Sequence, residues 1–394
     1  MRTHRLFDLF FILIIISPAT SQDNFNLGYL GEEYTDTVML CSDVTPYDCL
    51  AAYSVSWKFG IPLMHIHKNS IPPSVENALV ELNPARIILV GGPSVISQDV
   101  EMRLKKKVDV IRIWGITRYT TAINLARIFW NTSNVVVAID ESHAENLALA
   151  TGFAGYPFIY TGATPPTVVY EGLRDLGARD LIVIGSHHIP GYGELLPHIK
   201  YVEALFIVSD HRVAESICSI ASPPARWFLL PQSRINDFSY LFDNVDINII
   251  GDYNEINEIN SEIIDIIGEH LFVGKHASMK IRREVVDDFT SFCALQVIQE
   301  RNKWAYVQRK MMNRDIYDRL SRWSEHEKEL RSWWINASDN DRWTAYVQET
   351  ALFMCNPLIA DMIHTIIRDM DRSNCSCIQP FREQLELLSA RYLT

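Results

Sequence analysis

The stretch IILVGGPSVIS, residues 87–97, joins a short apolar run to two glycines and then to a segment with helical spacing. An unbroken apolar run that ends at a glycine is typical of a strand buried on both faces of a sheet. Gly91 and Gly92 permit a tight turn, and Ser97 is a suitable N-cap for a helix over 97–104. The stretch therefore predicts the strand–turn–helix unit of an α/β protein with a parallel sheet.

The same pattern returns in LIVIGSHHIPG, residues 181–191. A weaker third copy ends at Gly251, which Asp237 precedes by only 14 residues. The corresponding distance in the first copy, from Asp48 to Gly91, is 43 residues. A fixed spacing of independent motifs indicates an internal repeat, so we predict two complete units and a third that lacks about one helix and its second strand. Three pairs of landmarks lie 94 or 95 residues apart: Gly91 and Gly185, Arg118 and Arg212, and Pro62 and Pro157.

The expected elements follow from this repeat. Glycine is absent after Gly274 and helical spacing takes over, so we predict an all-α domain at the C-terminal end. The predicted domains are a leader at 1–21, repeat units at 35–133, 134–222 and 223–279, and a helical domain at 280–394. Strands are expected at 37–41, 61–66, 87–90 and 108–113 in the first unit, at 135–139, 158–160, 181–184 and 201–208 in the second, and at 225–230 and 247–250 in the third. In the last domain long helices are expected at 282–312 and 313–335.

Three motifs of the first unit together resemble the type 2 cell-wall-binding repeat family. They are GIPLM at 60–64, IILVGGPSVIS at 87–97 and RIWGITRYTTA at 112–122, in the order that the family's units show. The resemblance covers about residues 35–275 and weakens along the chain, because Ser186 replaces the second glycine and Ala277 stands where an arginine belongs. It implies tandem Rossmann- or Toprim-like sheets in a pseudo-threefold group, which hold secreted proteins non-covalently on anionic cell-wall polymers.

Candidate polymer-binding residues come from the resemblance and from general chemistry. The resemblance implicates the Pro-apolar-apolar strands, although these are apolar enough to be core strands. Glycine amides at a helix N-terminus favour an anion, but a tight turn needs no ligand. Arginines that begin a helix suit an acidic polymer, or else an ion pair between units. The candidates are Pro62, Leu63, Met64, Pro157, Phe158, Ile159, Gly91, Gly92, Arg118 and Arg212.

Basic residues are densest at 103–107, with Arg112 nearby, and such a run is either a polymer contact or a solvated helix end. The formal net charge of −12 argues against a nucleic-acid partner. No metal and no cofactor are expected, because the histidines at 65, 67, 187 and 188 lack further ligands at zinc spacing. The run at 140–143 holds acid, nucleophile and base types, but a catalytic triad is an arrangement in space.

The first residues predict export. Two arginines precede an apolar run at 9–16, and small residues follow, as in a signal peptide. An uncleaved anchor, which would be the only membrane contact, is the alternative. Sequons at 131, 336 and 374 agree with a glycoprotein. Cysteines at 355, 375 and 377 offer one disulfide, and five tryptophans of the last third suit a bundle core or a glycan-stacking surface.

These observations predict a secreted, non-enzymatic protein of the cell surface or wall, attached to an anionic envelope polysaccharide in the manner of S-layer anchoring. The helical domain would then be the cargo or would bind a protein partner. Two alternatives stay open. The chain is a secreted enzyme with a site between units, or its repeats serve only as a scaffold for the helical domain.

Overall fold

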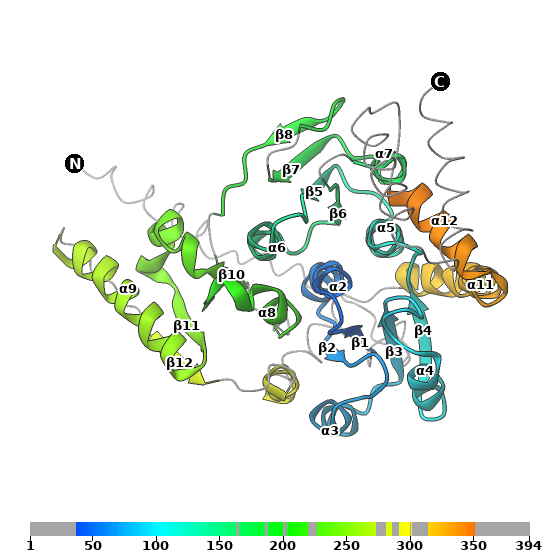
Figure 1. The fold of residues 1–394 in the computed structure, drawn as a ribbon, viewed down its shortest axis with the longest axis horizontal. Helices are drawn as coiled ribbons and strands as arrows, with labels where there is room; N and C mark the ends of the chain where they lie inside the picture. The colour runs from blue at the N-terminus through cyan, green and yellow to red at the C-terminus, as the bar shows by residue number, and fades with distance from the viewer. Residues whose placement is uncertain are drawn as a thin grey trace, which may run out of the picture.

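The computed structural model describes residues 37–162, 165–185, 188–199, 202, 204–219, 227–272, 281–285, 291–299, 301 and 314–350 (Figure 1). The expected leader, the sequon at 374 and the three last cysteines lie outside these residues. Within them, no helix is both long enough and apolar enough to cross a membrane.

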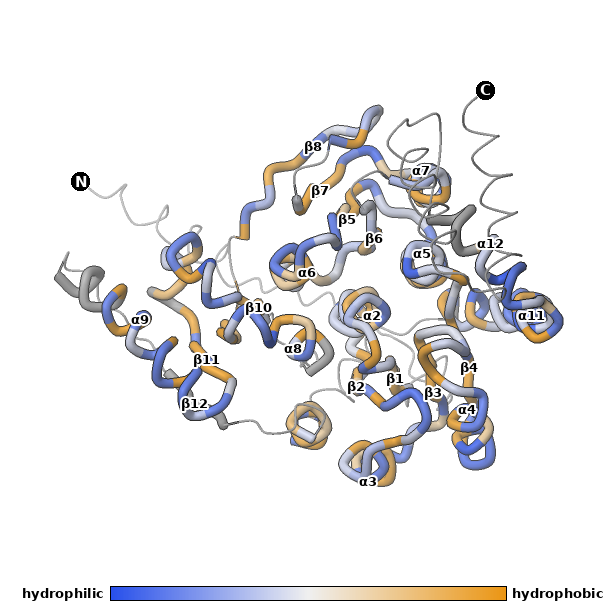
Figure 2. Tube along the Cα trace, viewed as in Figure 1, coloured by the Kyte–Doolittle hydropathy of each residue, from blue (hydrophilic) through white to orange (hydrophobic). Residues whose placement is uncertain are grey.

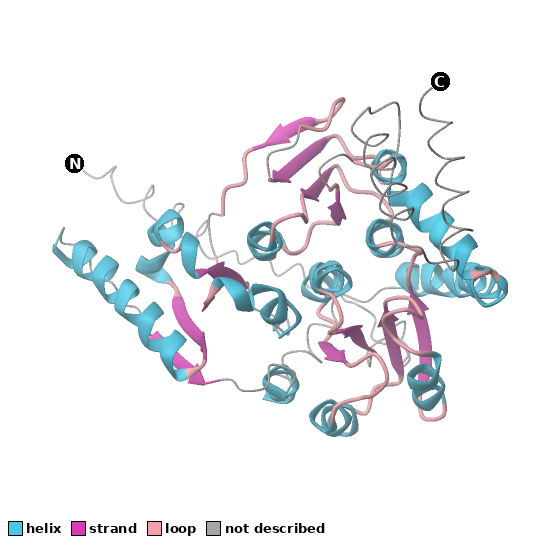
Figure 3. Ribbon diagram, viewed as in Figure 1, coloured by secondary structure: helices cyan, strands magenta, loops and turns pink. Residues whose placement is uncertain are grey.

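The described strands form three four-stranded parallel sheets, each flanked by helices (Figure 3). The strand orders are β2-β1-β3-β4, β6-β5-β7-β8 and β10-β9-β11-β12. In each sheet, with strands counted in chain order, the second strand lies at one edge beside the first. The third strand lies on the other side of the first, and the fourth forms the opposite edge. This common order confirms the predicted α/β class with parallel-sheet units.

The first unit follows the sequence prediction closely. It comprises β1 (Thr37–Ser42), α2 (Pro46–Phe59), β2 (Leu63–Ile66), α3 (Pro73–Leu82), β3 (Arg86–Val90), α4 (Gln98–Lys105) and β4 (Asp109–Ile113). Ser97 caps α4 by accepting a hydrogen bond from the Val100 amide. α5 (Arg118–Trp130) then leads to the second unit, and Thr117 and Thr120 form a capping box at its start.

The second unit is the shortened one. It comprises β5 (Val135–Ile139), α6 (Ala144–Ala150), a 3-10 turn (Thr151–Phe153), β6 (Phe158–Tyr160), α7 (Thr167–Asp175), β7 (Asp180–Ile184) and β8 (Gly193–Leu195). No helix is described between β7 and β8, and all three residues of β8 are exposed. An exposed strand suits the edge position that β8 occupies beside β7.

The third unit has four strands, which corrects the prediction that it lacks its second strand. The predicted loss of about one helix is confirmed, because only 3-10 turns lie between its second and third strands. It comprises β9 (Ala204–Val208), α8 (Val213–Ser219), β10 (Trp227–Pro231), β11 (Asp246–Gly251), α9 (Tyr253–Phe272) and β12 (Ile281–Val285), with 3-10 turns at Asp210–Arg212, Gln232–Arg234 and Asn236–Asn244. The repeat spacing predicted that 204–208 is the fourth strand of the second unit, equivalent to β4. Instead this apolar strand is β9, the first strand of the third unit, and it lies between β10 and β11. β12 likewise replaces the start of the helix predicted at 282–312.

The three units close into a ring around α2, α6 and α8, the helices that follow the first strand of each sheet (Figure 1). α2 packs on β6 of the second unit, α6 on β10 of the third, and α8 on β2 of the first. Hydrogen bonds cross all three junctions. The Gly155 amide donates to Ser54 Oγ at 3.0 Å, the Leu229 amide donates to Thr151 Oγ1 at 2.9 Å, and the Tyr53 hydroxyl donates to the Trp227 carbonyl at 3.1 Å. One apolar core runs through all three units.

The C-terminal helices α11 (Arg314–Asn336) and α12 (Asp339–Thr350) both contact α5, and α11 also packs on β4. The indole of Trp323 donates a hydrogen bond to the Arg112 carbonyl at 2.7 Å, and the Trp334 ring meets Trp114 edge-on. Figure 2 shows polar residues along the outer helices α9 and α11, whereas β11 runs through apolar residues. α11 is therefore built into the first unit rather than separate from it.

A disulfide joins Cys41 to Cys49, a pairing that was not predicted from the sequence, with 5.3 Å between their Cα atoms. It links the end of β1 to the first turn of α2, and both residues are fully buried. Cys293 is buried against the outer face of the first sheet, where its thiol donates to the Leu63 carbonyl at 3.5 Å.

Candidate functional site: the strand ends and two cavities

The two Pro-apolar-apolar segments occupy equivalent positions in the core. The Pro62 carbonyl accepts a hydrogen bond from the Met39 amide at 2.8 Å, and the Pro157 carbonyl accepts one from Val137 at 2.9 Å. The two prolines are buried, and the side chains that follow them are at most 2% exposed: Leu63, Met64, Phe158 and Ile159. These six residues therefore belong to core strands, which was the alternative to polymer binding. A polymer cannot reach their side chains in this conformation.

The glycine turn of the first unit is filled by protein. Gly91 has φ of 125°, in the region that favours glycine. A Cβ atom there would lie 2.8 Å from Val95 and 3.0 Å from the Asp48 carboxylate, and one on Gly92 would lie 2.9 Å from the Trp114 ring. The Gly91 amide already donates to the Ile113 carbonyl at 3.0 Å. Gly91 and Gly92 thus make a packed turn and leave no space for a phosphate.

A carboxylate abuts this turn in all three units. Asp48 does so in the first unit, and in the second a Cβ atom on Gly185 would lie 2.6 Å from Asp140. In the third unit a Cβ atom on Gly251 would lie 2.7 Å from Glu255 Oε2. In open parallel sheets ligands usually bind at this point, where the strand order reverses. Here each such point holds a carboxylate rather than open space, and an arginine already offsets the charge in two units, Arg118 beside Asp48 and Arg212 beside Glu255.

Asp48 lies at the junction of the first and second units. Burial raises its pKa to about 6, although the charge of Arg118 and a hydrogen bond with Thr121 favour the ionised form. Burial also raises the pKa of the Tyr160 hydroxyl, and the charges of Asp48 and Glu141 raise it further. This cluster is closed by packing, and neither cavity described below is lined by Asp48.

Replacing Asp48 by asparagine should change how stability depends on pH. A carboxyl whose pKa is about 6 in the folded chain and 3.8 ordinarily binds its proton more tightly when folded. It therefore lowers stability as pH rises from about 4 to about 6, by roughly 2 kcal/mol, and this loss persists above pH 6. Asp48→Asn should remove that loss, measured as urea-unfolding free energies at several pH values. An unchanged pH profile would contradict it.

The two candidate arginines are held in ion pairs. Arg118 stacks over the Tyr47 ring at 4.0 Å, and its Nη1 lies 3.9 Å from Glu141 Oε1 of the second unit. Arg212 pairs with Glu255 at 2.9 Å within the third unit. The prediction that they are equivalent is wrong in structural terms, because Arg118 follows the fourth strand of one sheet and Arg212 the first strand of another. An ion pair between units is the role that Arg118 fills.

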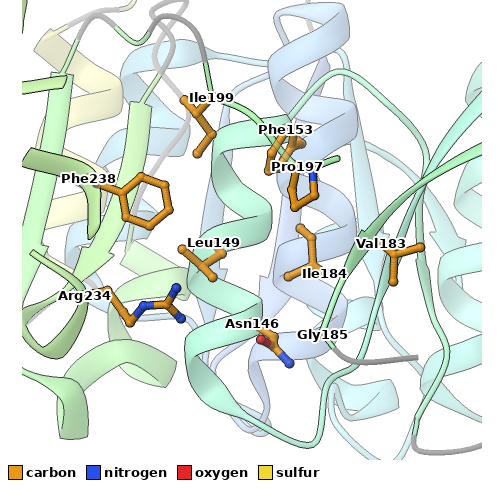
Figure 4. Close-up of a pocket in the computed structure, with 10 residues that line it drawn as sticks. All are labelled: Asn146, Leu149, Phe153, Val183, Ile184, Gly185, Pro197, Ile199, Arg234 and Phe238. Carbon is orange, nitrogen blue, oxygen red and sulfur yellow. The ribbon is translucent and has the colours of Figure 1, made fainter. Parts of the chain in front are cut away.

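A cavity of about 330 Å³ lies between the second and third units, beside the end of β7 (Figure 4). Its walls are mostly apolar, with Leu149 of α6 facing Phe238. Its polar residues include Asn146 and Arg234, and the guanidinium of Arg234 lies 2.5 Å from the Asp237 carboxylate. The sequence carried no signal for Arg234 or Phe238, because they come from the 3-10 turns that replace a helix in the third unit.

A larger cavity, of about 540 Å³, lies between α3 and α4 of the first unit. The basic run at 103–107 borders it, through Arg103, Lys106 and Lys107. Arg112 does not join this patch, because its side chain is buried and bonded to Glu101. Among the described residues, no group of three histidine, cysteine or acidic side chains is placed to hold a metal ion.

Comparisons with known proteins give partial matches. No protein-family model matches the chain. A stretch of 128 residues is 29% identical to the amidase enhancer of Bacillus subtilis (strain 168), over 32% of this chain and 18% of that protein. A stretch of 143 residues is 25% identical to the N-acetylmuramoyl-L-alanine amidase LytC of the same organism, over 35% of this chain and 29% of that protein.

Two solved structures are also similar. Cwp6 from Clostridium difficile is 18% identical with a TM-score of 0.46, over 55% of this chain and 41% of Cwp6. Cwp8 from the same organism is 13% identical with a TM-score of 0.32, over 75% of this chain and 44% of Cwp8. The chain spans less than a third of the length of either curated relative from B. subtilis.

Proposed function

We propose that this chain is a non-enzymatic protein of the cell surface, held non-covalently on an anionic polymer of the envelope by units of the type 2 cell-wall-binding repeat family. The observation that carries the proposal is the ring of three parallel sheets with one strand order, in a chain whose first unit carries the family's motifs. Repeated units offer several contacts to a repeating polymer, which raises overall affinity without strong single contacts.

The two sequence relatives support a binding role. One is named as an amidase and the other as an amidase enhancer, and the matched stretches make up 29% and 18% of their lengths. A segment shared by a catalyst and an enhancer is better explained by a common location on the wall than by a common reaction. The enclosed Asp48 cluster agrees, since no substrate reaches it.

The Cys41–Cys49 disulfide supports an extracytoplasmic location. Disulfides persist in oxidising compartments and are rare in the reducing cytosol. Together with the apolar run near the first residue, it supports export of the chain to the cell surface or wall.

Binding to walls tests the proposal. Full-length protein should sediment with purified B. subtilis walls at roughly 50 mM salt, and retention should fall severalfold at roughly 500 mM because salt screens charge contacts. Walls stripped of phosphate-linked polymers with hydrofluoric acid are the matched control and should retain little protein. Equal retention on stripped walls would contradict the proposal that an anionic polymer is the ligand. Release of new amino groups from the walls would contradict the non-enzymatic role.

A further inference from the structure

We propose that the acidic wall polysaccharide binds in the groove between α3 and α4 of the first unit, and not at the strand ends. We call this cavity of about 540 Å³ the α3–α4 groove. The proposal rests on the proposed function and names the site where that function is exercised. It starts from the finding that each strand-end turn abuts a carboxylate, whereas this groove has a basic rim.

The rim of the groove carries cations that its own carboxylates do not neutralise. Arg103 pairs with Glu76 at 3.0 Å, and Lys105 pairs with Glu101 at 2.7 Å. Lys106 and Lys107 are exposed, and neither has an ion pair with any carboxylate of the described residues. These two lysines therefore present positive charge to solvent on a chain whose formal net charge is −12. An anionic ligand is attracted to this rim more than to the strand ends.

The floor of the groove is apolar. It includes Leu79, Ile87 and Val108, and Val80 at its side is 77% exposed. Aliphatic side chains suit the C–H faces of sugar rings and the methyl groups of acetyl substituents, while the lysines suit phosphate or carboxylate groups. The ligand class is thus a wall polysaccharide whose repeating unit carries an acidic group beside such apolar faces.

Lysine footprinting on the full-length protein locates the site without mutation. Lysines are acetylated in the presence and absence of soluble polymer released from B. subtilis walls, and modification is read by mass spectrometry. Lys106 and Lys107 should be protected, whereas the exposed Lys68 and Lys328 should not. If the protein is retained on walls but Lys106 and Lys107 are not protected from acetylation, the groove is not the binding site and the proposed function still stands. Failure to bind native walls at all would overturn both.

Charge reversal provides the second measurement. The double variant Lys106→Glu, Lys107→Glu should weaken wall binding about tenfold, since two exposed attractive contacts become repulsive. The double variant Lys68→Glu, Lys328→Glu changes the net charge equally and should weaken binding less than about twofold. Val80→Asp, which adds a carboxylate at an exposed position of the groove, should weaken binding severalfold. Equal effects of the two double variants would overturn the proposal.

Discussion

Replacing Arg112 by methionine should lower the free energy of unfolding by about 3–5 kcal/mol, because it breaks a buried ion pair and leaves its partners behind. The Arg112 side chain is fully buried, and its Nε donates to Glu101 Oε2 at 2.9 Å. Its Nη1 donates to the carbonyls of Gly91 and Ile96 at 3.0 and 2.9 Å. The side chain therefore supports the glycine turn and neutralises a carboxylate that is 2% exposed.

The helix α11 adds a second arginine to the same carboxylate. Arg331 donates to both oxygens of Glu101 at 2.8 Å, and it also pairs with Glu327. Burial alone raises the pKa of Glu101, but hydrogen bonds from Arg331, the charge of Arg112 and a hydrogen bond from Lys105 outweigh it and lower the pKa to about 2. A lowered pKa contributes stability that is complete above about pH 4.5 and is lost as pH falls towards 2.

Urea unfolding of the full chain at neutral pH measures the loss. Arg103→Met is the matched control, because it removes an exposed arginine from an exposed ion pair and should cost less than about 1 kcal/mol. The Arg112 variant should also lose part of the acid dependence between pH 4.5 and pH 2. A cost of Arg112→Met no larger than that of the control would show that the buried network does not hold α11 and the turn together.

The unit architecture was predictable from the sequence where the signal is local. Pro62 and Pro157 precede second strands, and Gly91 and Gly185 end third strands, as their spacing indicated. The boundary of the third unit was not predictable from spacing. The run at 204–208 is sufficiently apolar to be a central strand of any sheet, and only its pairing with β10 and β11 assigns it to the third.

The candidate site was less predictable, because its chemistry depends on contacts distant in sequence. Glu101 and Arg331 are 230 residues apart, and the partner of Arg118 lies in another unit. Composition does not show that a carboxylate abuts each strand-end turn. The basic run at 103–107 was visible in the sequence. Which of its residues form ion pairs depends on where Glu76 and Glu101 lie in the fold.

Replacing both Cys41 and Cys49 by alanine should lower the free energy of unfolding by about 3 kcal/mol. The disulfide closes a short loop, since the two cysteines are 8 residues apart, and a closed loop of this size restricts the unfolded chain by about 2.5 kcal/mol. Loss of two buried sulfur atoms from the packed interior adds to this cost. The bond also links the first turn of α2, which carries Asp48, to the end of β1.

The comparison of oxidised and reduced protein isolates the bond itself. Reductant should destabilise the native chain by about 2.5 kcal/mol more than it destabilises the double alanine variant in urea unfolding, because any disulfide among the cysteines at 355, 375 and 377 is present in both proteins. Cys293→Ala is the control for loss of a buried thiol, and its cost should not depend on reductant. If reductant has no effect on the native chain, the cysteines are not bonded in solution, and the support that the disulfide lends to an extracytoplasmic location is withdrawn.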